Sequence, residues 1–425
     1  MPAHNIPNLS IPRIVILGGG FAGLKLARSI NTRHYQVVLI DQNNYHTFQP
    51  LLYQVATAGL EPDSIAYPLR KTLKNKAHTH IRMAAVESID LESKEVLTSI
   101  GKMSYSYLVI ATGAETNYFG NEQIEKFAVP MKSLTESLDL RSLILQNFES
   151  SLNQKDLNES DSLMNFVVVG GGPTGVELAG ALAELKKHVL PKDYPDLDIR
   201  RMQINLLEAA PRLLAAMSEK SSRYSLKYLE RMGVNVYTDT AVQDYNGKVV
   251  KTNKEIFETR NLIWAAGVKG NVPKGIDEKY LERGRIKVNE FAQLSEHPEV
   301  FALGDVSIMF TKKFSKPLPM LGSVAQQQGS YLAKYFNRMA RNQQVRPFEY
   351  SDKGTMATVG RNRAVVDLLG MTYGGTLAWL TWLFVHLMLL VDFRSRIMVF
   401  INWVWNYIRF DRGTRLIVRK FEQKK

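Results

Sequence analysis

The sequence contains no cysteine. This absence excludes disulfides, thiolate metal sites, Cys-ligated iron–sulfur clusters and a redox-active dithiol. Any electron transfer by this chain would therefore need a bound organic cofactor or metal ligands other than thiolates. Histidine is also scarce, because only eight are scattered along 425 residues without an HExxH motif. We therefore expect no metal site.

Long hydrophobic runs are missing too. No stretch reaches the roughly 20 apolar residues that a membrane-spanning helix needs, which argues against a polytopic membrane protein. Residues 1–13 lack the apolar segment of a secretory signal, so we expect a protein that stays on the cytoplasmic side. The remaining composition, with 45% hydrophobic and 22% charged residues, is that of a globular protein. The length predicts two or three domains.

Positive charge is in excess. The chain has 54 Lys and Arg against 41 Asp and Glu, a formal net charge of +13. A basic protein of this size attracts polyanions, either nucleic acid or an anionic lipid surface. The position of the basic residues along the chain helps to choose between these partners.

A β-α-β unit is predicted near the N-terminus. The strand at Arg13–Leu17 leads into Gly18-x-Gly20-x-x-Gly23 and a helix, and a second strand, Gln36–Ile40, ends at Asp41. In such a fingerprint the first glycine permits the tight turn, the second lets the backbone approach a pyrophosphate, and the third allows close helix packing. A carboxylate at Asp41 suits the hydroxyls of an adenosine ribose. The unit therefore predicts a dinucleotide site.

The same pattern returns about 150 residues later. A strand at 165–169 precedes Gly170-x-Gly172-x-x-Gly175 and a helix at 176–187, and the next strand ends at Glu208. A repeat of this length indicates duplicated domains. Glu208 suits the free 2′-hydroxyl of NAD and repels the 2′-phosphate of NADP. We interpret the nearby Arg212 as a surface residue at the start of the following helix.

Two dinucleotide sites in one chain suggest hydride transfer from NADH to a flavin. The spacing alone also allows the reverse order, with NAD on the first copy. The segment VFALGDVS favours flavin on the first copy, because Asp305 in such a turn could bond the ribityl chain. The alternative for Asp305 is an ordinary helix N-cap. The polar stretch at 147–161 is expected to be a linker or a long loop after a helix.

The C-terminal region differs from the rest. Two apolar segments, at 376–391 and 397–408, hold four of the five tryptophans (Trp379, Trp382, Trp403 and Trp405), and basic residues follow each segment. This composition is typical of amphipathic helices that lie in a membrane interface. Nucleic-acid binding is disfavoured, because the aromatic residues lie in apolar runs and not among basic ones. A buried dimer interface remains an alternative that is compatible with membrane binding.

Six segments carry a family resemblance: GGGFAGL, HTFQPLLYQVATAGL, LVIATGAETNYFG, GGGPTGVELAGALAEL, FALGDVS and the region WLFVHLMLLVDFRSRIMVFINWVWNYIRFDRGTRLI. On these segments, from residue 11 to about residue 416, the chain resembles the type II NADH:quinone oxidoreductases, which are single-subunit, non-proton-pumping flavoenzymes of respiratory membranes. The resemblance implies an α/β fold with two Rossmann-like dinucleotide-binding domains and a C-terminal amphipathic helical membrane anchor.

The domain boundaries follow from the same resemblance. It implies a discontinuous FAD-binding domain at 11–120 and 285–370, an NADH-binding domain at 121–284, and a membrane-anchoring region at 371–425. It further implies a set of residues that bind FAD or NADH. For FAD these are Gly18, Gly20, Phe21, Ala22, Gly23, Asp41, Thr47, Val86, Thr112, Asp305, Gly322 and Ser323, and for NADH they are Gly172, Pro173, Thr174, Gly175, Glu208, Ala266 and Gly267.

Two catalytic residues are also implied. Glu177 would approach the nicotinamide and the flavin, although a Glu at this position could instead be an exposed helix-start residue that complements the helix dipole. Gln327 matches the second Gln of the family's Ala-Gln-x-x-Gln quinone motif, whereas Ser323 stands where the first Gln is usual. Gln326 or Gln328 would compensate for that change, or they are simply polar helix residues.

Two histidines are expected to have other roles. We expect His46 to be structural beside the flavin and His386 to lie at the membrane interface.

The reaction implied by the resemblance is transfer of two electrons from NADH through FAD to a membrane quinone, in a homodimer bound peripherally to the cell membrane. Two alternatives stay open. One is a soluble NADH-dependent flavin reductase with another acceptor, and the other is a flavoprotein with a signalling or interaction role. Sulfide:quinone oxidoreductases share the fold but use cysteines, which this chain lacks.

Overall fold

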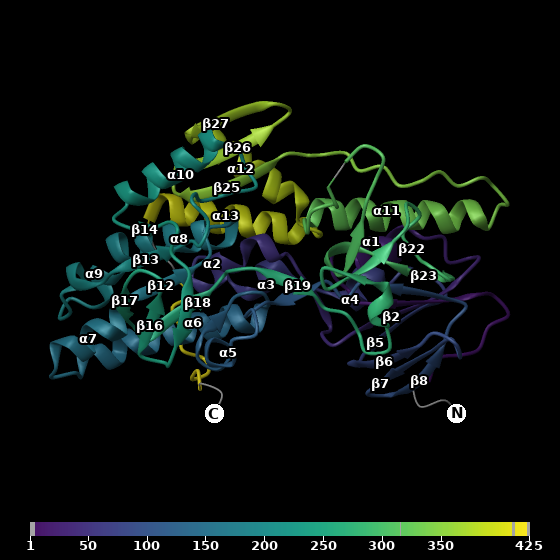
Figure 1. The fold of residues 1–425 in the computed structure, drawn as a ribbon, viewed down its shortest axis with the longest axis horizontal. Coiled ribbons are helices and arrows are strands. Elements are labelled where there is room, and N and C mark those ends of the chain that lie inside the picture. The colour runs from purple at the N-terminus through teal and green to yellow at the C-terminus, as the bar shows by residue number, and fades with distance from the viewer. Residues whose placement is uncertain (1–4, 315, 410–412, 423–425) are drawn as a thin grey trace. The chain divides into compact units, whose positions relative to one another are not determined.

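The computed structural model describes residues 5–314, 316–409 and 413–422. The chain divides into two compact units, many of whose helices and strands are labelled in Figure 1. Unit 1 comprises Met1–Thr47, Tyr67–Glu115 and Val268–Asp352, and unit 2 comprises Phe48–Ala66, Thr116–Gly267 and Lys353–Lys425. Unit 1 contains a mixed sheet and unit 2 a parallel one, and each unit carries one of the two glycine fingerprints.

Unit 1 is built on a nine-stranded sheet in the order β20-β21-β22-β23-β9-β1-β2-β5, with β24 paired to β21. The strands from β23 to β5 run parallel, and their residues form the core of the unit. β1 is buried along almost its whole length, which is the reason that its sequence is a continuous apolar run. Helix α1 packs against α11 so closely that a Cβ at Gly329 would lie 2.4 Å from the Ala22 carbonyl oxygen.

The main elements of unit 1 have the following bounds: β1 Arg13–Leu17, α1 Phe21–Ser29, β2 Gln36–Asp41, β3 Tyr45–Thr47, α4 Leu69–Leu73, β5 Thr79–Met83, β6 Val86–Asp90, β7 Glu95–Thr98, β8 Gly101–Ser104, β9 Tyr107–Ile110, β20 Leu281–Glu282, β21 Arg285–Val288, β22 Gln293–Leu294, β23 His297–Ala302, the 3-10 turn η4 Gly304–Val306, β24 Ser307–Met309 and α11 Gly322–Met339.

Unit 2 contains a parallel five-stranded sheet in the order β11-β18-β12-β13-β14. A C-terminal antiparallel sheet, β25-β26-β27, packs against α8 and α12. The contact with α8 depends on a small residue, because a Cβ at Gly180 would lie 2.2 Å from the Val359 carbonyl oxygen. Asp367 fixes this sheet to the rest of the unit, since its carboxylate accepts hydrogen bonds from the backbone and side chain of Ser218 at 2.7 and 2.9 Å.

The main elements of unit 2 have the following bounds: α2 Leu52–Ala56, α3 Pro62–Ile65, α5 Glu122–Phe127, β11 Val129–Pro130, α6 Leu134–Leu152, α7 Leu157–Met164, β12 Phe166–Val169, α8 Pro173–His188, β13 Ile204–Leu207, α10 Glu219–Arg231, β14 Asn235–Tyr237, β15 Val242–Tyr245, β16 Val249–Thr252, β17 Ile256–Glu258, β18 Asn261–Trp264, β25 Thr355–Gly360, β26 Arg363–Leu368, β27 Met371–Gly375, α12 Thr376–Leu389 and α13 Phe393–Arg409.

The expected linker at 147–161 is mostly helix. Its first residues complete α6 and its last residues belong to α7, which Asp156 caps by accepting from the Asn158 amide at 2.9 Å. The prediction of a linker or loop was wrong, because both helices have polar side chains that are buried with hydrogen-bond partners. The Asn147 side-chain amide, for example, donates to Asn261 Oδ1 at 2.7 Å.

The compact units and the predicted domains divide the chain differently. The unit with the first fingerprint takes in residues 268–284, and the unit with the second takes in 48–66 and 353–370. The last two segments join unit 2 because α2 packs against α6 and α8, and because β25 packs against α8. The predicted boundaries describe binding roles and stay a prediction.

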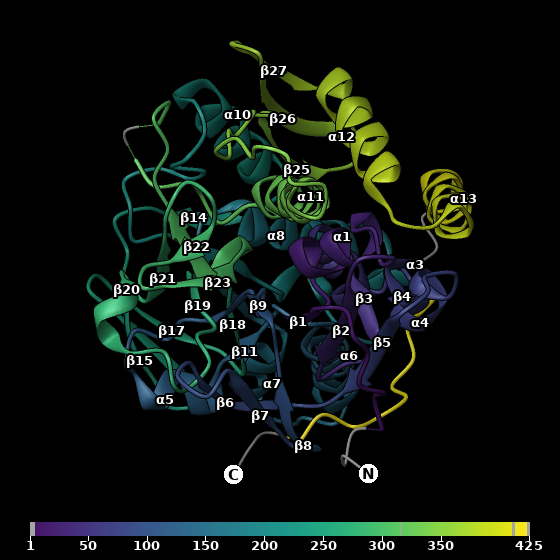
Figure 2. The ribbon, with the colours of Figure 1, turned by 90° about the vertical axis from the view of Figure 1, so that its right-hand side faces the viewer.

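The two C-terminal helices, α12 and α13, contact each other, as Figure 2 shows. α12 matches the first apolar segment, whereas α13 begins at Phe393, four residues before the second segment, so most of the expected break is helical. None of the helices among the described residues combines the length and the apolar character that crossing a bilayer requires.

Candidate functional site

The first glycine turn, in unit 1, is sterically closed on two sides and open on the third. Gly18 has φ +106°, and a Cβ there would lie 2.3 Å from the Ala111 carbonyl oxygen. A Cβ at Gly23 would lie 2.0 Å from the Gly18 carbonyl oxygen, which enforces the close approach of α1. At Gly20 an added Cβ would meet nothing within 4 Å. This open side is where the backbone approaches a pyrophosphate in a dinucleotide fold.

The Asp41 carboxylate lies beside this turn at the end of β2. Its Oδ2 accepts from the Gly19 amide at 2.6 Å, and its Oδ1 accepts from the Asn43 amide at 2.7 Å. Burial raises the pKa of Asp41, and these backbone hydrogen bonds act in the opposite direction. A carboxylate offers about four acceptor positions, so both oxygens retain capacity for ribose hydroxyls. On the other side of the turn, His46 Nδ1 lies 2.9 Å from the Gly19 carbonyl oxygen.

The other residues predicted to bind FAD are distributed over unit 1. Thr47 ends β3, Val86 begins β6, and Thr112 follows β9 and donates to the Asn271 carbonyl oxygen at 2.5 Å. Asp305 lies within the short turn η4, whose N-cap is Leu303, so the N-cap interpretation of Asp305 was wrong.

The predicted quinone motif forms the first part of α11, also in unit 1. At its start, a Cβ on Gly322 would lie 3.3 Å from the Phe21 ring. Gln327 pairs with the backbone of Ser351, donating to its carbonyl oxygen at 2.9 Å and accepting from its amide at 3.0 Å. Gln328 is buried and accepts from the Gly304 amide at 2.7 Å, so it has a structural role in this conformation. The Ser323 hydroxyl lies 3.3 Å from the Tyr350 hydroxyl.

The second glycine turn, in unit 2, has nearly the same backbone conformation and close contacts as the first. Gly170 has φ +109°, a Cβ at Gly175 would lie 1.9 Å from the Gly170 carbonyl oxygen, and a Cβ at Gly172 would meet nothing within 4 Å. The Glu208 carboxylate accepts from the Gly171 amide on one oxygen and from the Ala210 amide at 2.7 Å on the other. Unit 2 therefore has its own dinucleotide cradle.

Arg212 is partly buried in the loop before α10, so its interpretation as a surface residue at the start of that helix was wrong. Its guanidinium donates to the carbonyl oxygens of Met217 at 2.9 Å and Ala215 at 2.7 Å. The remaining predicted NADH residues border the same turn. Pro173 and Thr174 are exposed at the start of α8, and Ala266 and Gly267 follow β18, where a Cβ on Gly170 would lie 2.9 Å from Ala266 Cα.

Glu177, one turn into α8, is buried with 8% of its surface exposed. Its Oε1 accepts from the Thr358 amide at 3.3 Å. Burial raises the pKa of Glu177 to about 8, although the Thr358 amide and the Trp382 side chain act to lower it. The alternative of an exposed helix-start residue was wrong, because β25 and α12 cover this face of α8. The carboxyl is therefore largely protonated at neutral pH.

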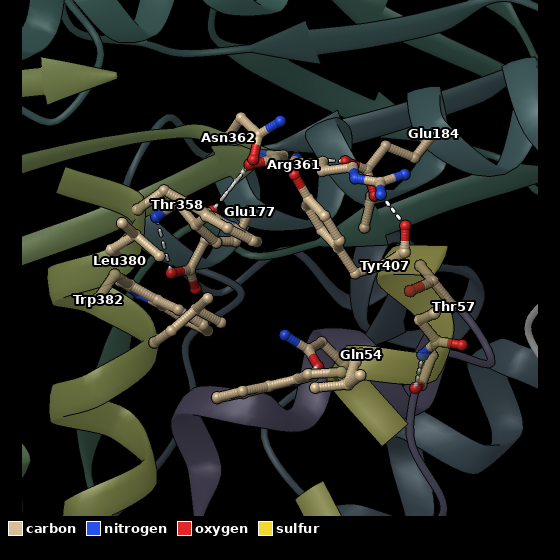
Figure 3. Close-up of a pocket in the computed structure, with 18 of the residues that line it drawn as sticks. Gln54, Thr57, Glu177, Glu184, Thr358, Arg361, Asn362, Leu380, Trp382 and Tyr407 are labelled. Atoms are coloured by element: carbon tan, nitrogen blue, oxygen red, sulfur yellow. Dashed lines mark hydrogen bonds between the residues drawn. The ribbon is translucent and has the colours of Figure 1, made fainter. Parts of the chain in front are cut away.

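Glu177 borders a cavity of about 750 Å³ within unit 2 (Figure 3). The walls come from α2, α8, the β25–β26 turn, α12 and α13. By exposed area the lining is mainly apolar, and its apolar residues include Ala181, Val189, Trp379, Leu380, Trp382, Leu383, Phe384, Leu387, Phe400, Trp403, Val404 and Ile408. A volume of this size lies within the range of small-molecule sites, and so does a mainly apolar lining with a few polar groups.

The polar groups of the cavity are held by the surrounding structure. Gln54 Oε1 accepts from Trp403 Nε1 at 2.8 Å, and its amide donates to the Tyr53 hydroxyl at 2.8 Å. Further along the wall, the Arg361 guanidinium lies 3.8 Å from the centre of the Tyr407 ring and donates to the Tyr407 carbonyl oxygen. Figure 3 shows Glu177 beside Trp382, with Arg361 and Tyr407 on another part of the wall.

The sequence did not predict this cavity, although several of its residues lie in segments that carried the family resemblance. Gln54 belongs to the QPLLYQVATAGL segment, and Trp382 and Trp403 belong to the tail. The prediction for His386 was wrong. This residue is not interfacial but buried, with its ring stacked on Trp382 at 4.0 Å and its Nδ1 2.8 Å from the Trp382 carbonyl oxygen. Burial lowers the pKa of His386 to about 4.

Comparison with known proteins agrees with the two cradles. Residues 12–329 match the family model described as pyridine nucleotide-disulphide oxidoreductase, and residues 353–412 match the one described as NDH2 C-terminal domain. The fold and the paired glycine turns define a member of the pyridine nucleotide-disulphide oxidoreductase class, which confirms the predicted fold class.

Individual relatives show to which family within this class the chain belongs. The chain is 34% identical over 418 residues to the type II NADH:quinone oxidoreductase Ndh of Mycobacterium tuberculosis, covering 94% of this chain and 89% of the relative. It is 30% identical over 372 residues to the type II NADH:quinone oxidoreductase of Staphylococcus haemolyticus, with 85% and 90% covered. The structure of NDH2 from Plasmodium falciparum in complex with NADH has a TM-score of 0.88 at 22% identity and covers 96% of this chain and 100% of that one. The chain belongs to the type II NADH:quinone oxidoreductase family, as its sequence segments predicted.

Proposed function

We propose that the protein oxidises NADH and, through bound FAD, reduces a membrane quinone without moving protons across the bilayer. The observation that carries this proposal is the cavity in unit 2. Its lining is mainly apolar, α12 and α13 form one side of it, and a buried carboxyl whose pKa burial raises to about 8 borders it. An apolar redox substrate that takes up protons suits such a cavity.

Unit 1 fits FAD. The open side of the turn at Gly20 leaves room for the pyrophosphate, and Asp41 retains acceptor positions for the ribose. Thr47, Val86, Thr112, Asp305, Gly322 and Ser323 remain predicted contacts of the rest of the cofactor. When bound, FAD accepts a hydride from NADH and passes the electrons on to an acceptor.

Unit 2 fits NADH. The pyrophosphate would lie over Gly172 at the N-terminus of α8, whose free amides and dipole favour an anion. Glu208 would accept from the ribose hydroxyls and repel a 2′-phosphate. Because Arg212 bonds two carbonyl oxygens of its own loop, no described contact directs it toward a phosphate. We therefore expect NADH to be preferred over NADPH.

The cavity would hold the quinone head group. Reduction of a quinone requires two protons as well as two electrons, and the protonated Glu177 carboxyl is placed to donate one proton to a quinone oxygen. Positioned acids of this kind contribute typically 10²–10⁴-fold to rate. Gln327, in unit 1, remains a quinone contact predicted from the resemblance, whereas Ser323 stands in place of the first Gln of that motif.

The outer surfaces of α12 and α13 would contact the lipid. These helices expose large apolar side chains away from the cavity lining: Leu377, Met388, Leu389, Phe393, Ile397 and Ile401. Exposed apolar surface of this extent is unusual on a soluble protein and marks an interaction site. The nearby Arg394 and Arg409 are exposed and would favour anionic headgroups. The proposal is therefore peripheral binding. The homodimer and the cytoplasmic side of the membrane are proposed from the sequence alone.

The flavin spectrum of the purified protein tests the proposal. We expect a yellow protein whose visible absorbance bleaches on anaerobic addition of NADH and returns on addition of a short-chain soluble quinone. Bleaching without recovery by quinone would favour a reductase with another acceptor. A protein that binds no flavin, or whose flavin NADH does not bleach, would refute the proposal.

A further inference from the structure

Phe119 has an unusual combination of exposure and backbone conformation. It lies in the loop at 117–121 of unit 2, with 69% of its surface exposed and φ of +53°. A left-handed conformation is unfavourable for a bulky residue, and an exposed phenyl ring gains nothing from burial. Such a conformation persists only where the surroundings impose it, and residues of this kind cluster at functional sites.

Three hydrogen bonds around Asn117 impose this conformation. Asn117 Oδ1 accepts from the Phe119 amide at 2.9 Å, and the Asn117 carbonyl oxygen accepts from Trp264 Nε1 at 2.8 Å. The Asn117 amide donates to the Gly267 carbonyl oxygen at 3.3 Å. The loop is therefore fixed to the carboxyl end of β18.

The phenyl ring of Phe119 lies over Gly267. Its Cζ would be 2.9 Å from a Cβ at Gly267, and its ring meets Trp264 edge-on with centroids 6.4 Å apart. Gly267 has φ +82°, and the absence of a side chain there makes room for the ring. The phenyl group is therefore held in place against the strand end while its outer surface stays open to solvent.

The sheet order shows which part of NADH would arrive at this point. β12, which leads into the second glycine turn, has β13 on one side and β18 on the other, all parallel. Ligands of such sheets lie across their carboxyl ends. Glu208, at the end of β13, would hold the adenosine ribose, and the N-terminus of α8 would hold the pyrophosphate. The nicotinamide half must then extend toward the end of β18, where Gly267 and Phe119 lie.

We propose that the Phe119 ring packs against the nicotinamide end of bound NADH and restricts its orientation, so that Phe119 is a positioning residue. This inference rests on the proposed assignment of unit 2 as the NADH module. A strained, fixed aromatic ring can perform this task at low entropic cost, because it loses little freedom when the ligand binds.

Replacing Phe119 by glycine separates this role from a structural one. Phe119→Gly removes the ring and suits the left-handed backbone, so we expect a midpoint of thermal unfolding at least as high as that of the wild type. The matched control is Leu369→Gly, since Leu369 is also exposed, at 83%, with φ +51°. Binding of two ligands to each FAD-loaded protein is measured by calorimetry. One is NAD⁺, and the other is ADP-ribose, which lacks the nicotinamide.

We expect Phe119→Gly to weaken NAD⁺ binding about 5–10-fold, the loss of one ring contact, and to leave ADP-ribose binding unchanged. Phe119→Tyr should keep the affinity for NAD⁺, and Leu369→Gly should bind both ligands as the wild type does. Equal weakening of both ligands, or none, would overturn the proposal. If Phe119→Gly is poorly folded, Phe119→Asn, which also tolerates this backbone, gives the same comparison.

The same experiment distinguishes this inference from the proposed function. A wild type that binds neither NAD⁺ nor ADP-ribose would refute the assignment of unit 2. A wild type that binds both and oxidises NADH, with an unchanged Phe119→Gly variant, would refute only the role of Phe119.

Discussion

The two glycine turns are nearly identical, whereas the helices that follow them face different environments. Gly18 and Gly170 have φ +106° and +109°, and each turn is bonded to the acidic residue that ends the next strand. Two residues after the last glycine, however, the first copy has the exposed Lys25 and the second has the buried Glu177. The geometry of a dinucleotide turn therefore does not determine the chemistry on the side of its helix.

What covers each helix explains the difference. α11 packs against α1, with Gly329 at the close approach, whereas β25 packs against α8, with Gly180 in the same role. On α8 the covering elements also form part of a cavity wall, because α12 and α13 extend them. Two similar modules therefore differ in what packs beside their helices.

Replacing the third glycine of each turn by alanine should have the largest effects, and these effects should differ between the two units. In Gly23→Ala and in Gly175→Ala the new Cβ would collide with a carbonyl oxygen at 2.0 and 1.9 Å. We expect Gly23→Ala to be purified without FAD. Gly175→Ala should stay yellow but show an NADH KM raised more than about tenfold, as overpacking costs roughly 1–3 kcal/mol. The opposite pattern would assign NAD to the first copy.

Removing the carboxyl at Glu177 should have the next largest effect. We expect Glu177→Gln to lower kcat for quinone reduction about 100-fold, within the range of a lost general acid, while NADH still bleaches the flavin. Lys25→Gln, at the matching position of α1, is the control and should leave both half-reactions unchanged. A Glu177→Gln variant with normal quinone reduction would remove the proton-donor role.

The pH dependence gives the same residue an independent test. Because the pKa of Glu177 is about 8, wild-type quinone reduction should fall as the pH rises through 8, and Glu177→Gln should lack this fall. The stability effect has the same sign. In the unfolded chain the carboxyl ionises at its ordinary pKa near 4.5, so the folded state loses stability as pH rises from about 4.5 to about 8. The midpoint temperature of thermal unfolding of Glu177→Gln should therefore exceed that of the wild type most clearly above pH 8.

The surface of α12 and α13 that faces away from the cavity predicts membrane binding. Leu377 and Ile401 are exposed at 67% and 53% and do not line the cavity. We expect Leu377→Glu and Ile401→Glu each to weaken sedimentation with anionic vesicles by about tenfold, because burying such a side chain contributes roughly 1.5–3 kcal/mol. Ile256→Glu, an equally exposed change on β17 of the nucleotide module, should bind vesicles as the wild type does. Equal losses in all three would indicate a general effect of charge.

The smallest expected effect concerns the link between α13 and α2. Trp403→Phe removes the hydrogen bond to Gln54 Oε1 and replaces the indole by a smaller aromatic ring. Since the net contribution of such a bond is about 1 kcal/mol, the KM for a soluble quinone should rise about fivefold. The KM for NADH should not change. A rise in both would show that the cavity and the dinucleotide cradle are not independent.

Local features of the fold were predictable from the sequence. The strand expected at Arg13–Leu17 is β1 with the same bounds, and the helix expected at 176–187 lies within α8. Both follow from short-range patterns, since buried parallel strands are continuous apolar runs and the glycine turn begins the helix. The acidic residues Asp41 and Glu208 lie beside their turns for the same reason.

The cavity was not predictable in this way. Glu177 is buried by β25 and α12, which lie about 180 to 200 residues further along the chain. The sequence pattern of α8 alone does not predict that these elements cover it. His386 was misassigned for the same reason, because the apolar segment that contains it has an inner and an outer face that only packing distinguishes. The exposed Phe119 gave no signal in the sequence beyond its place in a family segment.

α8 has a further consequence for how this molecule can change over evolution. The helix presents its first turn to the proposed NADH site and its flank to the proposed quinone site. A shift of α8 that improves one contact therefore displaces the other by a similar amount. Substitutions along this helix are therefore constrained from both ends. Adaptation to a new electron acceptor should accordingly proceed through substitutions in α12 and α13, while α8 stays unchanged.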